Sequence, residues 1–123
     1  MHARPPLGHR FGITSAQVAL YDVGVRWGLG DAGAALAAGR HLRPEQFETR
    51  ERRARLHTDM ARAYVQRGWP EPAIARLLQA HRQAASEVRD RPSIRRVAAE
   101  LVQRHRQVPG ARELAAILGP TPS

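Results

Sequence analysis

The sequence predicts an all-α protein built from helical hairpins. Its apolar fraction is 42% but its aromatic fraction is only 5%, and alanine, the best helix former and a weak strand former, supplies much of the rest. Apolar residues recur at helical spacing through most of the chain, and glycine and proline interrupt them at regular intervals. Alternating runs joined by Asn-Gly or Asp-Gly, which would indicate β-hairpins, are absent. The 123 residues suffice for one domain with a modest core.

The first hairpin is expected in the N-terminal third of the chain. Thr14 or Ser15 can cap a helix that ends near residues 28–30. A Gly-Asp turn then leads into a short alanine-rich helix that ends near His41, and Pro44 breaks the chain after it.

The second hairpin is expected in the middle of the chain. Thr49 can cap a long helix that runs to Arg67 and stops at the following glycine. Pro70 or Pro72 opens the next helix, which is expected to reach about Val88.

The third hairpin is expected to begin with Asp90 as a cap and Pro92 in the first turn. Its first helix runs to about Arg106. A Pro-Gly pair separates it from a final helix that ends at Leu118. The prediction is therefore six helices in three stacked hairpins.

The two ends of the chain lack helical periodicity. Residues 1–13 are predicted to form a disordered lead or linker, and residues 119–123 a disordered tail, which leaves the helical domain at 14–118. The sequence contains no apolar run typical of a signal peptide or a membrane span. There is no cysteine, which fits a reducing cytoplasm, so we expect a cytoplasmic protein without a disulfide and without membrane contact.

One residue pattern recurs in the longer helix of each hairpin, in copies about 37 residues apart. In each copy a leading residue is followed by apolar or small positions and then by a large apolar residue. The copies are Leu20, Val23, Gly24, Trp27; His57, Met60, Ala61, Tyr64; and Ile94, Val97, Ala98, Leu101. The small residue lets the partner helix approach closely, and the large one fills the space beside it. Ala73 is the small residue on the facing helix.

This pattern resembles the tetratricopeptide repeat, a helix–turn–helix unit of about 34 residues. The second copy matches the family at Met60, Ala61, Tyr64, Gly68, Ala73, Leu77 and Ala80. The first copy matches if its turn is one residue shorter. The third keeps only its first helix, and its final helix is expected to act as a cap. The resemblance implies a tetratricopeptide-like array, an α-solenoid, and the alternative is an ordinary helical bundle with chance spacing.

Residues 19–119 also resemble the C-terminal half of a group of helix-turn-helix transcriptional regulators from high-GC bacteria. The resemblance is carried by the Gly-Leu-Gly-Asp run at 28–31 and by residues 87–96. It implies a regulatory, ligand-sensing or dimerising domain. Residues 1–13 cannot hold a helix-turn-helix, so DNA-binding activity is not carried over. The chain is expected to be either a truncated reading frame or a stand-alone domain that works with a partner.

The net charge is +9, and all the basic residues that carry it are arginines. A codon bias towards GC-rich DNA is one explanation. The other is an anionic partner, such as an acidic protein, a phosphate or a nucleic acid.

No pattern in the sequence indicates catalysis. A Gly-x-Gly-x-x-Gly run at 28–33 follows a helix rather than a strand, so it does not predict a dinucleotide site. The even spacing of His57, His81 and His105 reflects the repeat, and no metal-ligand motif is present. The acidic residues lie among arginines, which favours paired charges over acid–base chemistry. We expect no enzymatic activity, no cofactor and no metal.

In tetratricopeptide arrays the first helices line a concave face, which would form a binding groove here. The resemblance places the following residues in it: Tyr21, Arg55, Thr58, Arg62, Gln66, Arg95 and Gln103. The three arginines could together hold a carboxylate or a phosphate. The alternative is a solvated basic face.

The expected function is regulation or sensing through the binding of a protein or an acidic peptide. A homodimerisation module, with Trp27 or Trp69 at its interface, is one alternative. Direct nucleic-acid binding through the arginine-rich helices is the other. Few aromatic residues lie among the arginines, so DNA is expected to bind only indirectly or weakly.

Overall fold

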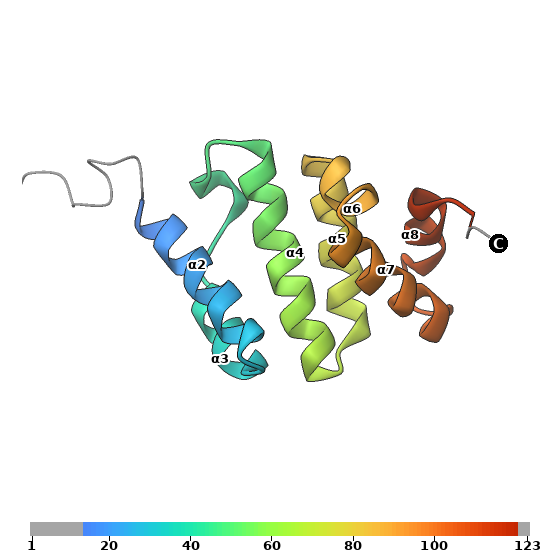
Figure 1. The fold of residues 1–123 in the computed structure, drawn as a ribbon, viewed down its shortest axis with the longest axis horizontal. Helices are drawn as coiled ribbons and strands as arrows, with labels where there is room; N and C mark the ends of the chain where they lie inside the picture. The colour runs from blue at the N-terminus through green and yellow to red at the C-terminus, as the bar shows by residue number, and fades with distance from the viewer. Residues whose placement is uncertain (1–13, 121–123) are drawn as a thin grey trace, which may run out of the picture.

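The computed structural model describes residues 14–120, in which seven α-helices and one 3₁₀ turn form and no strand occurs (Figure 1). The predicted all-α class is confirmed. The expected lead at 1–13 and the last three residues of the expected tail lie outside the described range. Within that range no helix is long and apolar enough to cross a bilayer.

The first hairpin consists of α2 (Ser15–Gly28) and α3 (Ala32–Gly39). Thr14 caps α2, because its hydroxyl accepts a hydrogen bond from the Gln17 backbone N–H at 3.1 Å, and the Gln17 side chain accepts one from Thr14 N–H at 3.2 Å. Asp31 caps α3 through the Ala34 N–H. At the end of α3 a side chain would collide with Met60 Sδ, so Gly39 allows α3 to pack closely against the next hairpin.

The second hairpin follows a 3₁₀ turn at Pro44–Gln46 and consists of α4 (Arg50–Arg67) and α5 (Pro70–Gln83). Thr49 caps α4 as predicted, through the Arg52 N–H. Gly68 ends α4 in the left-handed conformation, with φ of 81°. The turn is short, and the two helices lie side by side.

The predicted extension of the second hairpin to Val88 is wrong. The helix α5 ends at Gln83 because Ala84 adopts an extended backbone, with φ of −152° and ψ of 101°. A separate short helix, α6 (Ser86–Arg89), then crosses back against α4 and α5 and buries Val88 completely. Burial of this valine, rather than any glycine or proline signal, accounts for this additional helix.

The third hairpin consists of α7 (Pro92–Arg104) and α8 (Ala111–Leu118). Gly110 joins them in the left-handed conformation, with φ of 89°. A side chain there would also approach Leu78 Cδ1 to 2.8 Å, so both the backbone conformation and the limited space favour glycine at this position. The helix α8 packs against both α7 and α5.

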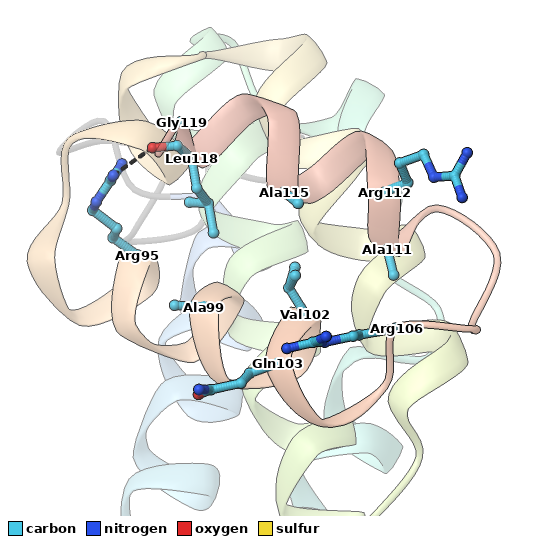
Figure 2. Close-up of a pocket in the computed structure, with 10 residues that line it drawn as sticks. All are labelled: Arg95, Ala99, Val102, Gln103, Arg106, Ala111, Arg112, Ala115, Leu118 and Gly119. Atoms are coloured by element: carbon cyan, nitrogen blue, oxygen red, sulfur yellow. Dashed lines mark hydrogen bonds between the residues drawn. The ribbon is translucent and has the colours of Figure 1, made fainter. Parts of the chain in front are cut away.

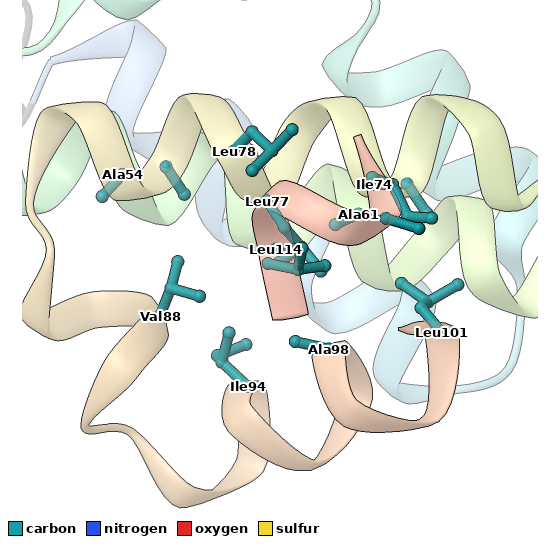
Figure 3. Close-up of a cluster of buried hydrophobic side chains, with 13 residues drawn as sticks. Ala54, Ala61, Ile74, Leu77, Leu78, Val88, Ile94, Ala98, Leu101 and Leu114 are labelled. Atoms are coloured by element: carbon teal, nitrogen blue, oxygen red, sulfur yellow. The ribbon is translucent and has the colours of Figure 1, made fainter. Parts of the chain in front are cut away.

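The three hairpins lie in a row, with one hydrophobic core on each side of α4 (Figure 1). The first core contains Ala16, Leu20, Val23, Ala35, Phe47, Leu56, Met60 and Ala63. The second core, drawn in Figure 3, contains Ala54, Ala61, Ala73, Ile74, Leu77, Leu78, Ala80, Val88, Ile94, Ala98, Leu101, Ala111 and Leu114. Tyr64 packs against both cores, so α4 lies between the two cores and contributes residues to each of them.

The residues of the recurring pattern lie at these helix contacts. Those that are buried are Leu20, Val23, His57, Met60, Ala61, Ala73, Ile94, Ala98 and Leu101. Gly24, Trp27 and Tyr64 are half-buried. The pattern found in the sequence therefore marks the surfaces on which the helices pack.

Candidate functional site

The structure does not bring the three predicted groove arginines together. Arg55 and Arg62 both project from α4, but Arg95 is engaged elsewhere. Its guanidinium donates hydrogen bonds to the Arg89 carbonyl oxygen at 3.0 Å and to the Leu118 carbonyl oxygen at the end of α8. This side chain therefore ties α7 to α8 and is not among the charges that shift the pKa values of Arg62 and Asp59.

Thr58 also does not line a groove. It is fully buried, and its hydroxyl donates to the Arg55 carbonyl oxygen at 3.2 Å. The short helix α6, absent from the sequence prediction, packs against α4. Thr58 is therefore a packing residue.

The remaining predicted groove residues are exposed but lie in different places. Gln66 donates to the Trp27 carbonyl oxygen at 2.7 Å and so joins α4 to α2. Tyr21 is 76% exposed on α2. Gln103 lines a separate pocket between α7 and α8, which Arg95 also lines.

Two charged residues outside the predicted groove, Glu87 and Arg91, complete the surface of α4. Glu87 of α6 accepts a hydrogen bond from Arg91 at 3.2 Å, and its carboxylate lies 3.7 Å from the Arg55 guanidinium. The Glu87 side chain is only 15% exposed, so this carboxylate is shielded while it joins two arginines from different segments. Its position depends on α6, which no local sequence signal revealed.

Asp59 lies beneath these arginines and is buried. Burial raises the pKa of its carboxyl to about 6, against the opposing effects of Arg55, of the Trp27 indole N–H, of Arg91 and of Arg62. The carboxylate is thus mainly ionised at neutral pH, with several cations around it.

The Arg62 guanidinium stacks on Trp27, with its central carbon 4.3 Å from the ring centroid. The indole Nε1 is buried and has no acceptor in hydrogen-bond geometry, although it lies close enough to Asp59 to favour the ionised carboxylate. Burial lowers the pKa of Arg62, and the neighbouring positive charge of Arg91 lowers it further. Arg96 acts in the same direction and so also lies near this group.

We call this surface the arginine face: it comprises Arg55, Arg62, Arg91 and Arg96, with Asp59 and Glu87 between them. Four cations face two carboxylates, so the surface keeps an excess of positive charge at neutral pH. Glu87 holds Arg91 and lies close to Arg55, and the Trp27 ring supports Arg62. Such a fixed, cationic surface can accept further carboxylates or phosphates.

An exposed apolar stripe continues this surface onto α2. Val18, Tyr21 and Val25 are 57%, 76% and 39% exposed and follow one another at helical spacing. Val18 and Val25 occupy the positions of the repeat that Arg55 and Arg62 occupy in the next copy. The Gln66–Trp27 and Arg62–Trp27 contacts fix α2 beside α4.

His57 serves packing within this structure. Its Nδ1 lies 3.1 Å from the Arg76 guanidinium, and burial, together with that positive charge, lowers its pKa to about 4. Across residues 14–120 no three histidine, aspartate or glutamate side chains cluster in a way that could hold a metal ion. Comparisons of the chain with protein-family models, with curated proteins and with solved structures find no match.

Proposed function

We propose that this chain is a non-enzymatic regulatory module, built as a tetratricopeptide-like array, that binds an acidic segment of a partner protein on the arginine face. The observation that carries the proposal is the convergence of three arginines, Arg55, Arg62 and Arg91, on two shielded carboxylates, with Arg96 near Arg62. The row of hairpins, with the recurring residues at their contacts, supports the repeat architecture. The regulatory role rests on the resemblance of residues 19–119 to helix-turn-helix regulators.

The arginine face suits carboxylate recognition because it is already organised. The Trp27 ring supports the Arg62 guanidinium, and Glu87 holds Arg91 and lies close to Arg55. Less side-chain freedom is then lost when a ligand binds. The Arg55 side chain is still 47% exposed, so its donors can reach an incoming carboxylate.

The apolar stripe on α2 adds a second kind of contact. Val18 and Val25 can cover aliphatic side chains that flank the acidic residues of the ligand, because they continue the line of Arg55 and Arg62. The proposed ligand is therefore an extended segment that combines acidic and aliphatic residues.

The proposal is tested by fluorescence anisotropy with a labelled, extended peptide that contains aspartates, prolines and two leucines. The double variant Arg62→Ala, Arg91→Ala is expected to bind at least about tenfold more weakly than the wild type, since charge-assisted hydrogen bonds are lost. Arg40→Ala, which removes an exposed arginine at the end of α3, is the matched control and should bind normally. Equal affinity of the double variant and the control would contradict the proposal. Tighter binding of random duplex DNA, with a steep salt dependence, would indicate a nucleic-acid partner instead.

A homodimerisation role is favoured by one specific observation, the exposure of Val18, Tyr21 and Val25 on one helix. If this stripe joins two copies, sedimentation at two concentrations will show a dimer. The Tyr21→Glu variant will then remain a monomer. A wild-type chain that is monomeric at both concentrations would exclude this second role.

A further inference from the structure

A second surface lies at the far end of the row of hairpins, between α7 and α8. It is a groove of about 630 Å³ (Figure 2). Its apolar lining includes Ala99 and Val102 from α7 and Ala115 from α8, while Arg106 and Arg112 carry positive charge at its edges. We call it the terminal groove. It shares no residue with the arginine face.

Each of the other two hairpins in this molecule packs against a following helix on the side where the terminal groove lies in the third hairpin. The hairpin α2–α3 receives α4, which contacts both of its helices. The hairpin α4–α5 in turn receives α6 and the third hairpin. The hairpin α7–α8 is the last in the row, and within residues 14–120 no further helix packs on its outer side (Figure 1). Small residues such as Ala99 and Ala115 let a helix approach closely.

The charges of the terminal groove favour an acidic occupant. Three arginines line it and no acidic residue does. Within residues 14–120, Arg106 and Arg112 form no ion pair, whereas Arg95 is committed to carbonyl oxygens. The nearest acid along α8, Glu113, instead faces Arg82 at 3.8 Å. An approaching helix that carries acidic residues beside its apolar stripe would therefore meet uncompensated positive charge.

Other segments of this chain match the groove poorly. Residues 1–13 include Arg4 and Arg10 and contain no acidic residue. The exposed side of α2 offers Asp22, but its carboxylate is paired with Arg26 at 3.2 Å. A second copy would also bring a net charge of +9 towards a cationic rim. A partner protein of opposite charge is the better match.

We propose that the terminal groove docks an amphipathic helix of a partner protein, with alanine and leucine along one face and glutamates on both sides of it. Its apolar face would pack on Ala99, Val102 and Ala115, and its glutamates would pair with Arg106 and Arg112. This is a second, separate binding surface, beyond the arginine face.

The test uses the whole chain and a labelled helical peptide with leucine and alanine at i, i+3, i+4 and i+7 flanked by glutamates. Ala115→Glu places a negative charge on the groove wall and should weaken binding at least about tenfold. Ala116→Glu makes the same change at the next position of α8, which is exposed and outside the groove lining, and should bind like the wild type. A peptide with lysines in place of the glutamates should not bind.

Arg112→Glu provides a second variant that should also weaken binding of the helical peptide. Because Arg112 is exposed, we expect this variant to fold. Circular dichroism and thermal unfolding confirm that each variant is folded. Equal binding by Ala115→Glu and Ala116→Glu, or equal binding of the lysine peptide, would overturn the proposal. A wild-type dimer that Ala115→Glu dissociates would also overturn it, because the occupant would then be a second copy. The extended acidic peptide should bind Ala115→Glu normally, so failure here is distinguishable from failure of the arginine face.

Discussion

The arginine face and the terminal groove present the same side chain in two different electrostatic settings. On the arginine face, Glu87 and Asp59 lie among the guanidinium groups, and Glu87 pairs with Arg91 and lies close to Arg55. In the terminal groove the lining contains no carboxylate, and small apolar residues fill the space between the arginines. The residues around an arginine therefore decide whether its guanidinium is held in place or is free to pair with a ligand.

The two settings have different energetic consequences. Asp59 is buried at a cost in desolvation that its neighbouring arginines only partly offset, as its raised pKa indicates. That cost accompanies an organised surface suited to directional hydrogen bonds. The terminal groove carries no such cost, and its arginines act mainly by attracting an oppositely charged helix.

The largest expected effect comes from Leu114→Ala, which breaks the terminal groove. Leu114 is fully buried in the second core, where α8 packs on α5 (Figure 3). The change should lower the free energy of unfolding by about 3 kcal/mol, measured by chemical denaturation. Peptide binding to the terminal groove should be lost, while the arginine face keeps most of its affinity under native conditions. A loss below about 1 kcal/mol would show that α8 contributes little to the fold.

A smaller effect is expected from Asp59→Asn, which removes the buried charge of the arginine face. The pKa of Asp59 rises from 3.8 unfolded to about 6 folded. Its contribution to stability is therefore full below pH 3.8 and is lost as the pH rises through 6. The neutral amide should stabilise the protein by at most about 3 kcal/mol at pH 7 and by almost nothing at pH 3.5.

His57 supplies an internal control for this experiment. Its pKa falls from 6.5 to about 4 on folding, so its contribution is full above pH 6.5 and is lost as the pH falls through 4. The two residues oppose each other between pH 4 and 6, and the wild type should show a shallow dependence there. Asp59→Asn should expose the contribution of His57 and lose stability as the pH falls from 6.5 to 4. Destabilisation of the variant at pH 7 would show that the attraction between Asp59 and the neighbouring arginines outweighs the cost of its burial.

Local signals in the sequence were enough to predict most of the fold. The caps at Thr14 and Thr49 and the stop at Gly68 were recognisable, because each depends on a few adjacent residues. The predicted cap at Asp90 is wrong: Arg91 occupies the cap position of α7, and the Asp90 carboxylate pairs with Arg89. The recurring pattern also identified the residues on which the hairpins pack.

The candidate site was only partly predictable. Arg55 and Arg62 were identified from their repeat positions, but Glu87 and Arg91 were missed because α6 forms through burial of Val88 rather than through a local signal. The carbonyl contacts of Arg95 could not be predicted for a related reason. Its hydrogen bond to Leu118 depends on how α8 folds back on α7, which is a tertiary property.

Whether the two surfaces bind their ligands independently can be measured by competition between the two peptides. The labelled extended acidic peptide is first bound to the wild-type chain, and the unlabelled glutamate-flanked helix is then added until the terminal groove is saturated. We predict that the anisotropy of the labelled peptide stays unchanged, since the two surfaces share no residue. Displacement of the labelled peptide, at helix concentrations that saturate the groove, would contradict the independence of the two surfaces and indicate that both peptides bind at one site.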